Sequence, residues 1–496
     1  MTEAELGTIR TNVPARLDRL PWCRWHWMIV IGLGTVWILD GLEVTLVGTL
    51  SGQISKHGSG VAITQSQITG LAAALYVTGA CVGALFFGRL TDRFGRKNLF
   101  MITLAVYLLA TAMTALSFTA WWFFLFRFMT GFGIGGEYAA INSAIDELIP
   151  KKHRGRIDIM INGTYWAGAT VGALLTIPLT SRLATNVGWR VAFGLGVVLG
   201  LVILLVRRNV PESPRWLFVH GRDKQADKLV GEIEQTVESE TNARLEPPDE
   251  YLTIKQRHSI KLWEIARTMF TKYPRRSTLG FALFIGQAFL YNAITFVFGQ
   301  ILQTFFHVEP VSVGYYFAIV AIGNLCGALV LAPLFDSVGR KPLIAGTYIL
   351  SGVLLLITAW LFNAGSLSAW TLTACWAVVL FFASAGASAA YLTVSEIFPL
   401  ETRALAIAFF YAIGTAAGGI AGPLLFSKLV STKNPSDTAL GFVIGAILMI
   451  LAGLVEVFLG VRAERRSLEE LAEPLTAQGG GGPPPQREDV VEPVRV

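Results

Sequence analysis

The sequence Asp92-Arg93-Phe94-Gly95-Arg96-Lys97 returns in the second half of the chain as Asp336-Ser337-Val338-Gly339-Arg340-Lys341. A second pattern also occurs twice: a glutamate followed after three residues by a proline and after seven by an arginine, beginning at Glu147 and at Glu396. In both cases the copies lie about half a chain length apart, next to long apolar stretches. The chain is therefore expected to consist of two similar halves, as in membrane proteins that bind a ligand between two helix bundles.

The composition indicates an integral membrane protein. Hydrophobic residues make up 53% of the chain and charged residues only 15%, whereas soluble domains contain about 25% charged residues. The 50 glycines fit this interpretation, because small residues allow membrane helices to approach closely. The net charge of +6 arises from lysines and arginines that gather in short loops on one side of the apolar stretches, so a nucleic-acid partner is not expected.

Twelve apolar stretches are long enough to cross a hydrocarbon core, which takes about 20 helical residues. They are 27–50, 68–87, 99–118, 122–149, 157–181, 189–206, 278–303, 311–334, 343–362, 370–394, 405–430 and 439–461. We therefore expect an all-α membrane protein with twelve transmembrane helices in two pseudo-symmetric six-helix bundles. The distribution of basic loop residues predicts that both termini face the cytoplasm.

The remaining segments are polar and complete the expected organisation of the chain. It comprises a cytoplasmic N-terminal segment (1–26), an N-terminal six-helix bundle (27–208), a cytoplasmic linker (209–277), a C-terminal six-helix bundle (278–461) and a cytoplasmic tail (462–496). Short helices are expected in the linker near 222–238 and 260–270. The tail contains G-G-G-G-P-P-P and is expected to be disordered, because such a sequence cannot form a packed core.

Together, these motifs resemble those of the major facilitator superfamily. R-x-x-x-G-x-G from Arg127 belongs to the same set, and P-E-S-P-R-W-L at 211–217 with E-L-I-P-K-K-H-R-G-R at 147–156 resembles the sugar-porter-like branch. D-G-L-E at 40–43 resembles the D-G-Y-D signature of aromatic-acid/proton symporters, and G-G-E-Y at 135–138 is similar to a motif of metabolite/proton symporters. The resemblance implies a secondary transporter whose two bundles rock about a central cavity.

Some charged residues lie well inside the predicted spans, where a charge costs about 2.5–3.5 kcal/mol on insertion scales. These candidates for proton coupling are Asp40, Glu43, Arg127 and Glu137. Helix rise places Glu43 about 10 Å and Arg127 about 8 Å below the same membrane surface, so the two side chains can meet. The resemblance implies the same pair, because sugar/proton symporters have an aspartate and an arginine at these positions. A permanent ion pair that only holds two helices together is the alternative interpretation.

Glu137 and Asp40 are predicted to lie deeper in the membrane. Glu137 lies roughly 22 Å from the outer surface by the same count. It is interpreted as a second protonation site, as a substrate contact, or as a protonated carboxyl group bonded to a neighbouring helix. Asp40 lies one turn below Glu43 on nearly the same face.

Polar and aromatic residues near the middle of spans 5, 7 and 10 are candidates for substrate binding. They are Asn162, Tyr165, Trp166, Gln287, Tyr291, Asn292, Trp376 and Tyr391. Gln287 and Asn292 resemble the Q-x-x-x-x-N of sugar porters, whose amides bind substrate hydroxyl groups. Tyr291 replaces the glycine before that asparagine, which predicts a narrower pocket. Contacts between helices are the alternative role for these side chains.

The duplicated motifs supply the predicted cytoplasmic gate. By resemblance, Arg96 pairs with Glu147 and Arg340 with Glu396, and such ion pairs break when the inner face opens. Asp92 and Asp336 are expected in loops facing the starts of other helices, where a carboxylate is stabilised by the helix dipole. The gate comprises Asp92, Arg93, Arg96, Glu147, Arg154, Arg156, Asp336, Arg340, Glu396 and Arg403. Static solvated ion pairs are the alternative.

The expected function is import of a small organic solute, such as an organic or aromatic acid or a sugar, together with protons. An uncoupled uniporter and a non-transporting membrane sensor of the same fold are the alternatives. The sequence contains no G-x-x-x-x-G-K-[ST] phosphate-binding loop and no helical histidine pair, so no enzyme activity, cofactor or metal is expected. The expected partners are the solute, protons and the lipid bilayer of the cell membrane, and the chain is expected to be monomeric.

Overall fold

The computed structural model describes residues 8–207, 211–248, 251–255, 267, 269–398, 403–463, 466 and 471–472. Almost all of these residues are helical, and the twelve predicted spans are all present as long helices. The fold is therefore all-α, with twelve transmembrane helices in two six-helix bundles. The predicted disordered tail and most of the helix expected near 260–270 lie outside the described residues.

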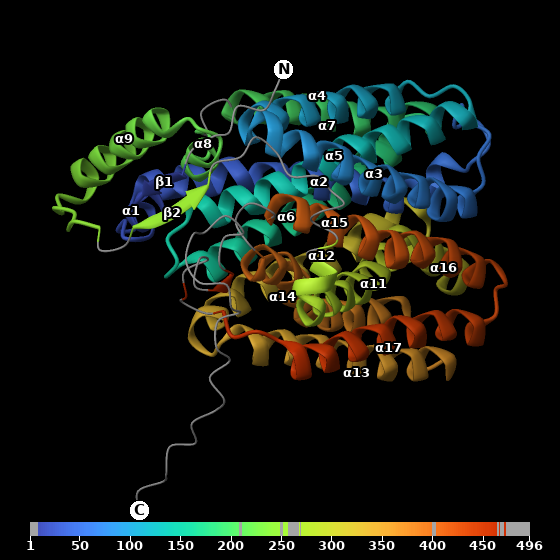
Figure 1. Ribbon diagram of the computed structural model, residues 1–496. Coiled ribbons are helices and arrows are strands. Elements are labelled where there is room, and N and C mark those ends of the chain that lie inside the picture. The colour runs from blue at the N-terminus through green and yellow to red at the C-terminus, as the bar shows by residue number, and fades with distance from the viewer. Residues whose placement is uncertain are drawn as a thin grey trace, which may run out of the picture.

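The first bundle contains the six long helices of the N-terminal half. They are α2 (Arg24–Ile54), α3 (Ala73–Phe94) with the π-helical turn η1 (Gln67–Ala72) before it, α4 (Arg96–Ala115), α5 (Ala120–Leu148), α6 (Arg154–Arg182) and α7 (Thr185–Arg207). In Figure 1 these helices, coloured blue to green, form the upper layer of the molecule.

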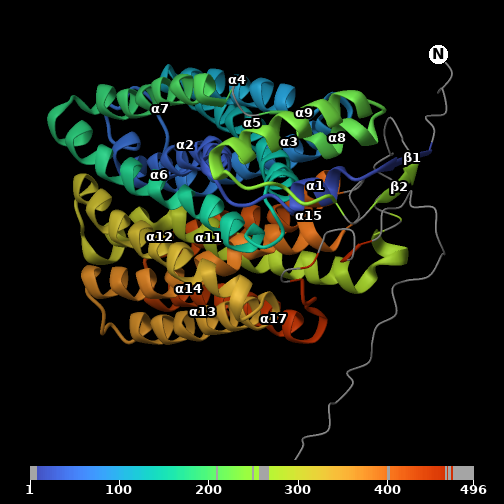
Figure 2. The same ribbon diagram turned by 90° about the vertical axis from the view of Figure 1, so that its left-hand side faces the viewer.

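The second bundle forms the lower layer in Figure 1 and lies against the first over the length of the helices, as Figure 2 also shows. Its helices are α11 (Pro274–Phe306), α12 (Val313–Ser337) with the 3-10 turn η2 (Pro310–Ser312), α13 (Arg340–Asn363), α14 (Ala369–Ile397), α15 (Arg403–Thr415), α16 (Ala421–Ser431) and α17 (Pro435–Leu459). A π-helical turn, η4 (Ala416–Ile420), joins α15 to α16, so that the three together make one span.

Within the described residues, ten helices are long and apolar enough by themselves to cross a membrane. The two other spans, α5 and α6, have 29 residues each. They are less apolar because they carry more polar and charged residues, including Arg127 and Glu137 on α5.

Glycines allow α2 and α6 to pack with their backbones in contact. A Cβ atom at Gly41 would lie 1.8 Å from the carbonyl oxygen of Tyr165, and one at Gly168 would lie 1.8 Å from that of Ile38. Because a backbone carbonyl cannot move away as a side chain can, neither position accepts a larger residue without separating the helices. This contact holds the aromatic residues of α6 beside those of α2.

A small unit lies against the end of the first bundle where the basic loops gather. It contains α1 (Val13–Asp18), α8 (Pro214–Val219) and α9 (Asp223–Thr241), the last of which matches the helix predicted at 222–238. Strands β1 (Thr8–Thr11) and β2 (Leu252–Lys255) pair antiparallel, with Thr8 opposite Lys255. The sequence analysis missed these strands, because four-residue segments show no usable periodicity and their pairing depends on a contact between distant parts of the chain.

Candidate functional site

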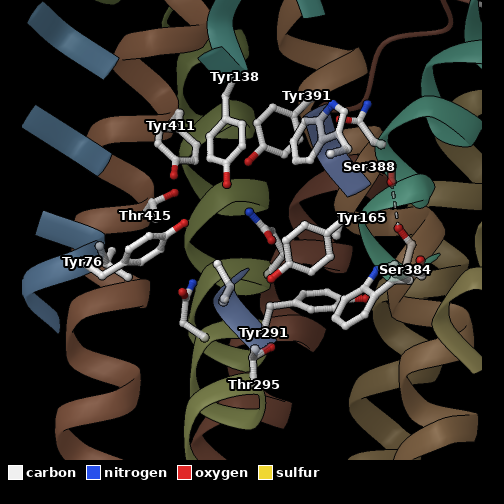
Figure 3. Close-up of a pocket in the computed structure, with 18 residues that line it drawn as sticks. Tyr76, Tyr138, Tyr165, Tyr291, Thr295, Ser384, Ser388, Tyr391, Tyr411 and Thr415 are labelled. Atoms are coloured by element: carbon white, nitrogen blue, oxygen red, sulfur yellow. Dashed lines mark hydrogen bonds between the residues drawn. The ribbon is translucent and has the colours of Figure 1, made fainter. Parts of the chain in front are cut away.

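A cavity of about 130 Å³ lies between the two bundles, and Figure 3 shows the side chains that surround it. Helices α2, α3, α5 and α6 line it on one side and α11, α14 and α15 on the other. The lining residues are Trp37, Val44, Tyr76, Val77, Tyr138, Asn162, Tyr165, Trp166, Gln287, Tyr291, Asn292, Thr295, Ser384, Ala387, Ser388, Tyr391, Tyr411 and Thr415. None of these residues is charged, so the wall consists of aromatic rings, amides and hydroxyl groups.

The cavity brings together seven of the eight side chains predicted to bind substrate. They are Asn162, Tyr165, Trp166, Gln287, Tyr291, Asn292 and Tyr391. The prediction for Trp376 was wrong. This residue is fully buried on α14, packs against Phe298 and Phe442 and does not line the cavity. Trp376 precedes Tyr391 by four turns, which places it roughly 22 Å farther along the helix.

The sequence analysis missed half of the aromatic wall. The missed aromatic residues are Trp37, Tyr76, Tyr138 and Tyr411. The rings of Trp37 and Tyr138 stack with centroids 4.7 Å apart, and Tyr411 meets Tyr138 edge-on at 4.9 Å. Tyr138 stands in the G-G-E-Y motif and Trp37 one turn before Asp40, so both could have been found by following the helix face. Tyr76 and Tyr411 belong to no motif and are brought in only by the packing of the helices.

The structure brings the predicted pair Glu43 and Arg127 together as a buried ion pair. Both side chains are buried, with 0% and 1% of their surface exposed. The guanidinium group also lies over the rings of Tyr76, at 5.6 Å, and Phe193, at 5.4 Å. Neither charged residue lines the cavity, whereas Tyr76, which contacts the guanidinium group, does.

Asp40 lies directly behind the aromatic wall. Its two carboxylate oxygens accept hydrogen bonds from the hydroxyl groups of Tyr76, at 3.0 Å, and Tyr138. Both tyrosines line the cavity, whereas Asp40 does not. Asp40 is therefore linked to the cavity through two phenol groups, and Tyr76 connects it in turn to Arg127.

Glu137 occupies a separate place in the first bundle. It is buried on α5 and accepts a hydrogen bond of 3.4 Å from Thr103 on α4. It does not line the cavity, so its predicted contact with substrate is not found in this structure. The hydrogen bond to a neighbouring helix fits the third interpretation of this residue.

The family model described as "Sugar (and other) transporter" matches residues 25–475, which span all twelve helices. The chain belongs to this transporter family. It is therefore a multi-pass membrane transporter of the major facilitator superfamily and not an enzyme, as its resemblance to that superfamily predicted.

Relatives within this transporter family match the chain over most of its length. The niacin transporter NiaP of Acinetobacter baylyi is 26% identical, covering 93% of this chain and 99% of NiaP. The glucose transporter GlcP of Staphylococcus epidermidis is 25% identical, covering 88% of this chain and 98% of GlcP. Among solved structures, the proton:xylose symporter XylE bound to 6-bromo-6-deoxy-D-glucose has the same fold, with a TM-score of 0.72 and 19% identity over 90% of this chain and 98% of XylE.

The duplicated motifs of the transporter form corresponding ion pairs at one end of each bundle. Arg96 binds Glu147 at 2.9 Å, and Arg340 pairs with Glu396. Asp336 accepts a hydrogen bond of 2.9 Å from the backbone N–H of Arg156, near the start of α6 in the other bundle. This contact places a carboxylate at a helix N-terminus, as predicted.

The expectation that Asp92 and Asp336 lie in loops was wrong, because each occupies the last turn of a helix, α3 and α12 respectively. Arg93 is exposed and lies 5.3 Å from the ring of Phe94. Arg403 begins α15, and the side chains of Asp92 and Arg403 are outside the described part of the structure.

Arg154 has a partner that the motifs did not predict. Asp18, at the end of α1, binds Arg154 at 3.1 Å and Arg215 of α8 at 3.3 Å. Arg154 and Arg215 are both fully buried. The N-terminal segment therefore bridges the first bundle and the linker through one carboxylate.

The opposite end of the transporter is joined by neutral hydrogen bonds. Thr69 on η1 donates to the side-chain oxygen of Gln300 on α11 at 2.7 Å. Ser427 on α16 donates to the same oxygen at 3.1 Å and lies 3.2 Å from the carbonyl oxygen of Ser66. The bundles thus meet at both ends, with the cavity between the two contacts.

Proposed function

We propose that this transporter imports a small organic solute together with protons, by alternating access across the plasma membrane, with both termini in the cytoplasm. The observation that supports proton coupling most strongly is the buried ion pair of Glu43 and Arg127. A carboxylate in this position can take up a proton only if its guanidinium partner reorganises, because a buried charge without a partner is costly.

A chain of contacts joins the pair to the solute site. The guanidinium group of Arg127 lies over the ring of Tyr76, whose hydroxyl group binds Asp40 and whose side chain lines the cavity. Protonation of Glu43 releases Arg127 and thereby changes the position of Tyr76 in the wall. Proton binding and solute binding are coupled in this way without sharing a site.

The two ends of the molecule supply the gates. At the cytoplasmic end Asp336 joins α12 to α6, and at the outer end Gln300 joins α11 to η1 and α16. The contacts of Asp336 with Arg156 and of Gln300 with Thr69 cross between the bundles, so each must break for the cavity to open on that side. The names of the relatives, a niacin transporter, a glucose transporter and a proton:xylose symporter, support a small ring compound as the solute.

The decisive experiment measures uptake into proteoliposomes with and without an inward proton gradient. The first panel of solutes is nicotinate, nicotinamide, glucose and xylose, chosen from the names of the relatives. We expect the gradient to drive accumulation above equilibrium in the wild-type protein. Glu43→Gln should abolish accumulation while retaining exchange of internal for external solute.

Other outcomes would assign the alternatives. Uptake that only equilibrates, and is unchanged by Glu43→Gln, would show an uncoupled uniporter. A protein that binds a solute but moves none would show that the fold serves as a sensor. Efflux driven by the opposite gradient would contradict the proposed direction.

A further inference from the structure

The cavity has the size and the walls of a site for a single ring. Eight of its lining residues are tyrosine or tryptophan. For comparison, an engineered apolar cavity of about 150 Å³ in another protein binds benzene. A cavity of about 130 Å³ therefore accepts one six-membered ring with small substituents, in contact with the aromatic side chains of the wall.

Three tyrosines of the wall use their hydroxyl protons in hydrogen bonds to Asp40 and Asn324. Tyr76 and Tyr138 donate their hydroxyl protons to Asp40, and Tyr291 donates to the side-chain oxygen of Asn324 at 3.1 Å. A phenol whose single proton is used elsewhere has only lone pairs to offer a ligand. These three tyrosines therefore present acceptors to the cavity, which suit a cation or an N–H group and repel a carboxylate.

The charged residues around the cavity also favour a positively charged ligand. No lysine, arginine or histidine is among the lining residues that the structure describes. The nearest cation, Arg127, already binds Glu43, whereas Asp40 has no ion-pair partner within the described ranges. A buried carboxylate is stable in its charged form only with a compensating charge nearby. A positively charged ligand in the cavity would supply it.

We infer that this cavity binds a small aromatic cation, of the class of N-alkylated or protonated nitrogen heterocycles, with Asp40 as the counter-charge behind Tyr76 and Tyr138. The aromatic faces stabilise the cation through their quadrupoles. An anionic ring acid, which the sequence resemblance had suggested, is disfavoured because nothing in the described wall compensates its charge. The inference rests on the proposed function and names the class of solute that the same site takes.

The test compares three ligands of nearly the same shape and different charge. The probes are 1-methylnicotinamide (cation), nicotinamide (neutral) and nicotinate (anion). Their dissociation constants are measured at pH 7 by isothermal titration calorimetry on the full chain in nanodiscs, without any gradient. We expect the cation to bind about tenfold more tightly than nicotinamide, which is the size of a partly desolvated cation–π contribution, and nicotinate to bind most weakly. Tightest binding of nicotinate, or equal binding of all three, would overturn the inference.

Two variants test whether the preference for the cation comes from Asp40. Asp40→Asn should reduce the affinity for the cation by about tenfold and that for nicotinamide much less, because only the charged ligand interacts with the missing charge while both ligands meet the altered hydrogen bonds of Tyr76 and Tyr138. Glu456→Gln, which neutralises a buried carboxylate on α17 away from the cavity, is the matched control and should change neither. An equal loss for both ligands in Asp40→Asn would show a structural role and overturn the inference. If Asp40→Asn does not fold, the ranking of the three probes on the wild-type protein still decides.

This experiment separates the two proposals. A nicotinate preference combined with proton-driven uptake would refute the aromatic-cation site and leave proton coupling intact. Selective cation binding without any transport would support the site and refute the proposed transport function.

Discussion

The two bundles have the same architecture but contribute different chemistry to the centre of the molecule. The first bundle supplies the charged residues near the cavity, namely Asp40, Glu43, Arg127 and Glu137. The wall contributed by the second bundle is neutral, with the amides of Gln287 and Asn292 and the hydroxyl groups of Thr295, Ser384 and Ser388. By contrast, the ion pairs of the duplicated motifs are present in both halves, as Arg96–Glu147 and Arg340–Glu396.

This difference suggests that both halves take part in gating, whereas proton binding and solute recognition are divided between them. A gate requires both bundles to separate, so both retain the same charged motif. The proposed proton binding needs an ionisable group and its partner within one rigid unit, and among the described residues the first bundle provides them beside the cavity. The second bundle is free to recognise the uncharged parts of the solute.

The largest expected effect comes from breaking the ion pair of the first bundle. Glu43→Gln or Arg127→Met alone should destabilise the protein by about 3–5 kcal/mol, because each leaves an uncompensated buried charge. The double variant should recover most of this loss, since it removes both charges. Thermal unfolding of the four proteins in the same detergent provides the double-mutant cycle.

Transport by the double variant, Glu43→Gln with Arg127→Met, tests whether the ion pair is needed for proton coupling. It should be stable but should not accumulate solute in response to a proton gradient. Single variants as stable as the wild type would show that the pair is not a desolvated ion pair, and the contrast between the bundles would lose its basis.

A change in the second bundle should have a smaller effect, on solute binding rather than on stability. Gln287→Ala removes one amide from the cavity wall and should weaken solute binding by about fivefold, the size of one hydrogen bond. Proton-driven accumulation at saturating solute should persist, because the proton site is in the other bundle. Gln53→Ala on α2, whose residue does not line the cavity, is the control. Loss of coupling in Gln287→Ala at full solute occupancy would contradict the division between the bundles.

The fold and the main pair could be predicted from the sequence because their signals are local. Twelve apolar stretches and two duplicated motifs indicate the architecture, and helix rise places Glu43 and Arg127 at similar depths, where the resemblance also implies a pair. The aromatic wall could be predicted only in part. Tyr76 and Tyr411 come from α3 and α15, whose rotation about their own axes depends on close contacts such as those of Gly131 with the backbone of Tyr76 and of Gly414 with Phe284, and no periodicity shows that rotation.

The same reasoning explains the other errors. Trp376 is an aromatic residue on α14, a helix that lines the cavity, but it lies too far along this helix to reach the cavity. The bridge from Asp18 to Arg154 and Arg215 joins three segments that are far apart in the sequence, so no motif indicated it. The expected solute, an organic or aromatic acid or a sugar, came from resemblance and stays a prediction.

Glu456 tests the contrast between the bundles, because it is a buried carboxylate in the second bundle and could itself bind a proton. It lies on α17 with 1% of its surface exposed, and neither oxygen has a hydrogen-bond partner in the described part of the chain. It does not line the cavity, so Glu456→Gln should leave proton-driven uptake unchanged. It should raise stability slightly, by about 1 kcal/mol, because an unsatisfied buried acid is replaced by a neutral amide. Loss of proton-driven uptake in this variant would show that the second bundle also carries a proton site.

The smallest expected effect concerns the small unit of α1, α8 and α9, which lies against the first bundle. Burial raises the pKa of Glu234 on α9, but hydrogen bonds from Arg16 and Arg19 lower it by more, so that its pKa lies below the ordinary value. Glu234 therefore stabilises the attachment of α1 above the ordinary pKa of a glutamate, and this contribution is lost as the pH falls through the depressed value. Hydrogen exchange of the α1 amides should accelerate in that acidic range in the wild type, after correction for the intrinsic rate. In Glu234→Gln the exchange should already be faster at pH 7 and should show no such step. An identical pH profile in the two proteins would mean that Arg16 and Arg19 do not hold α1 through this carboxylate.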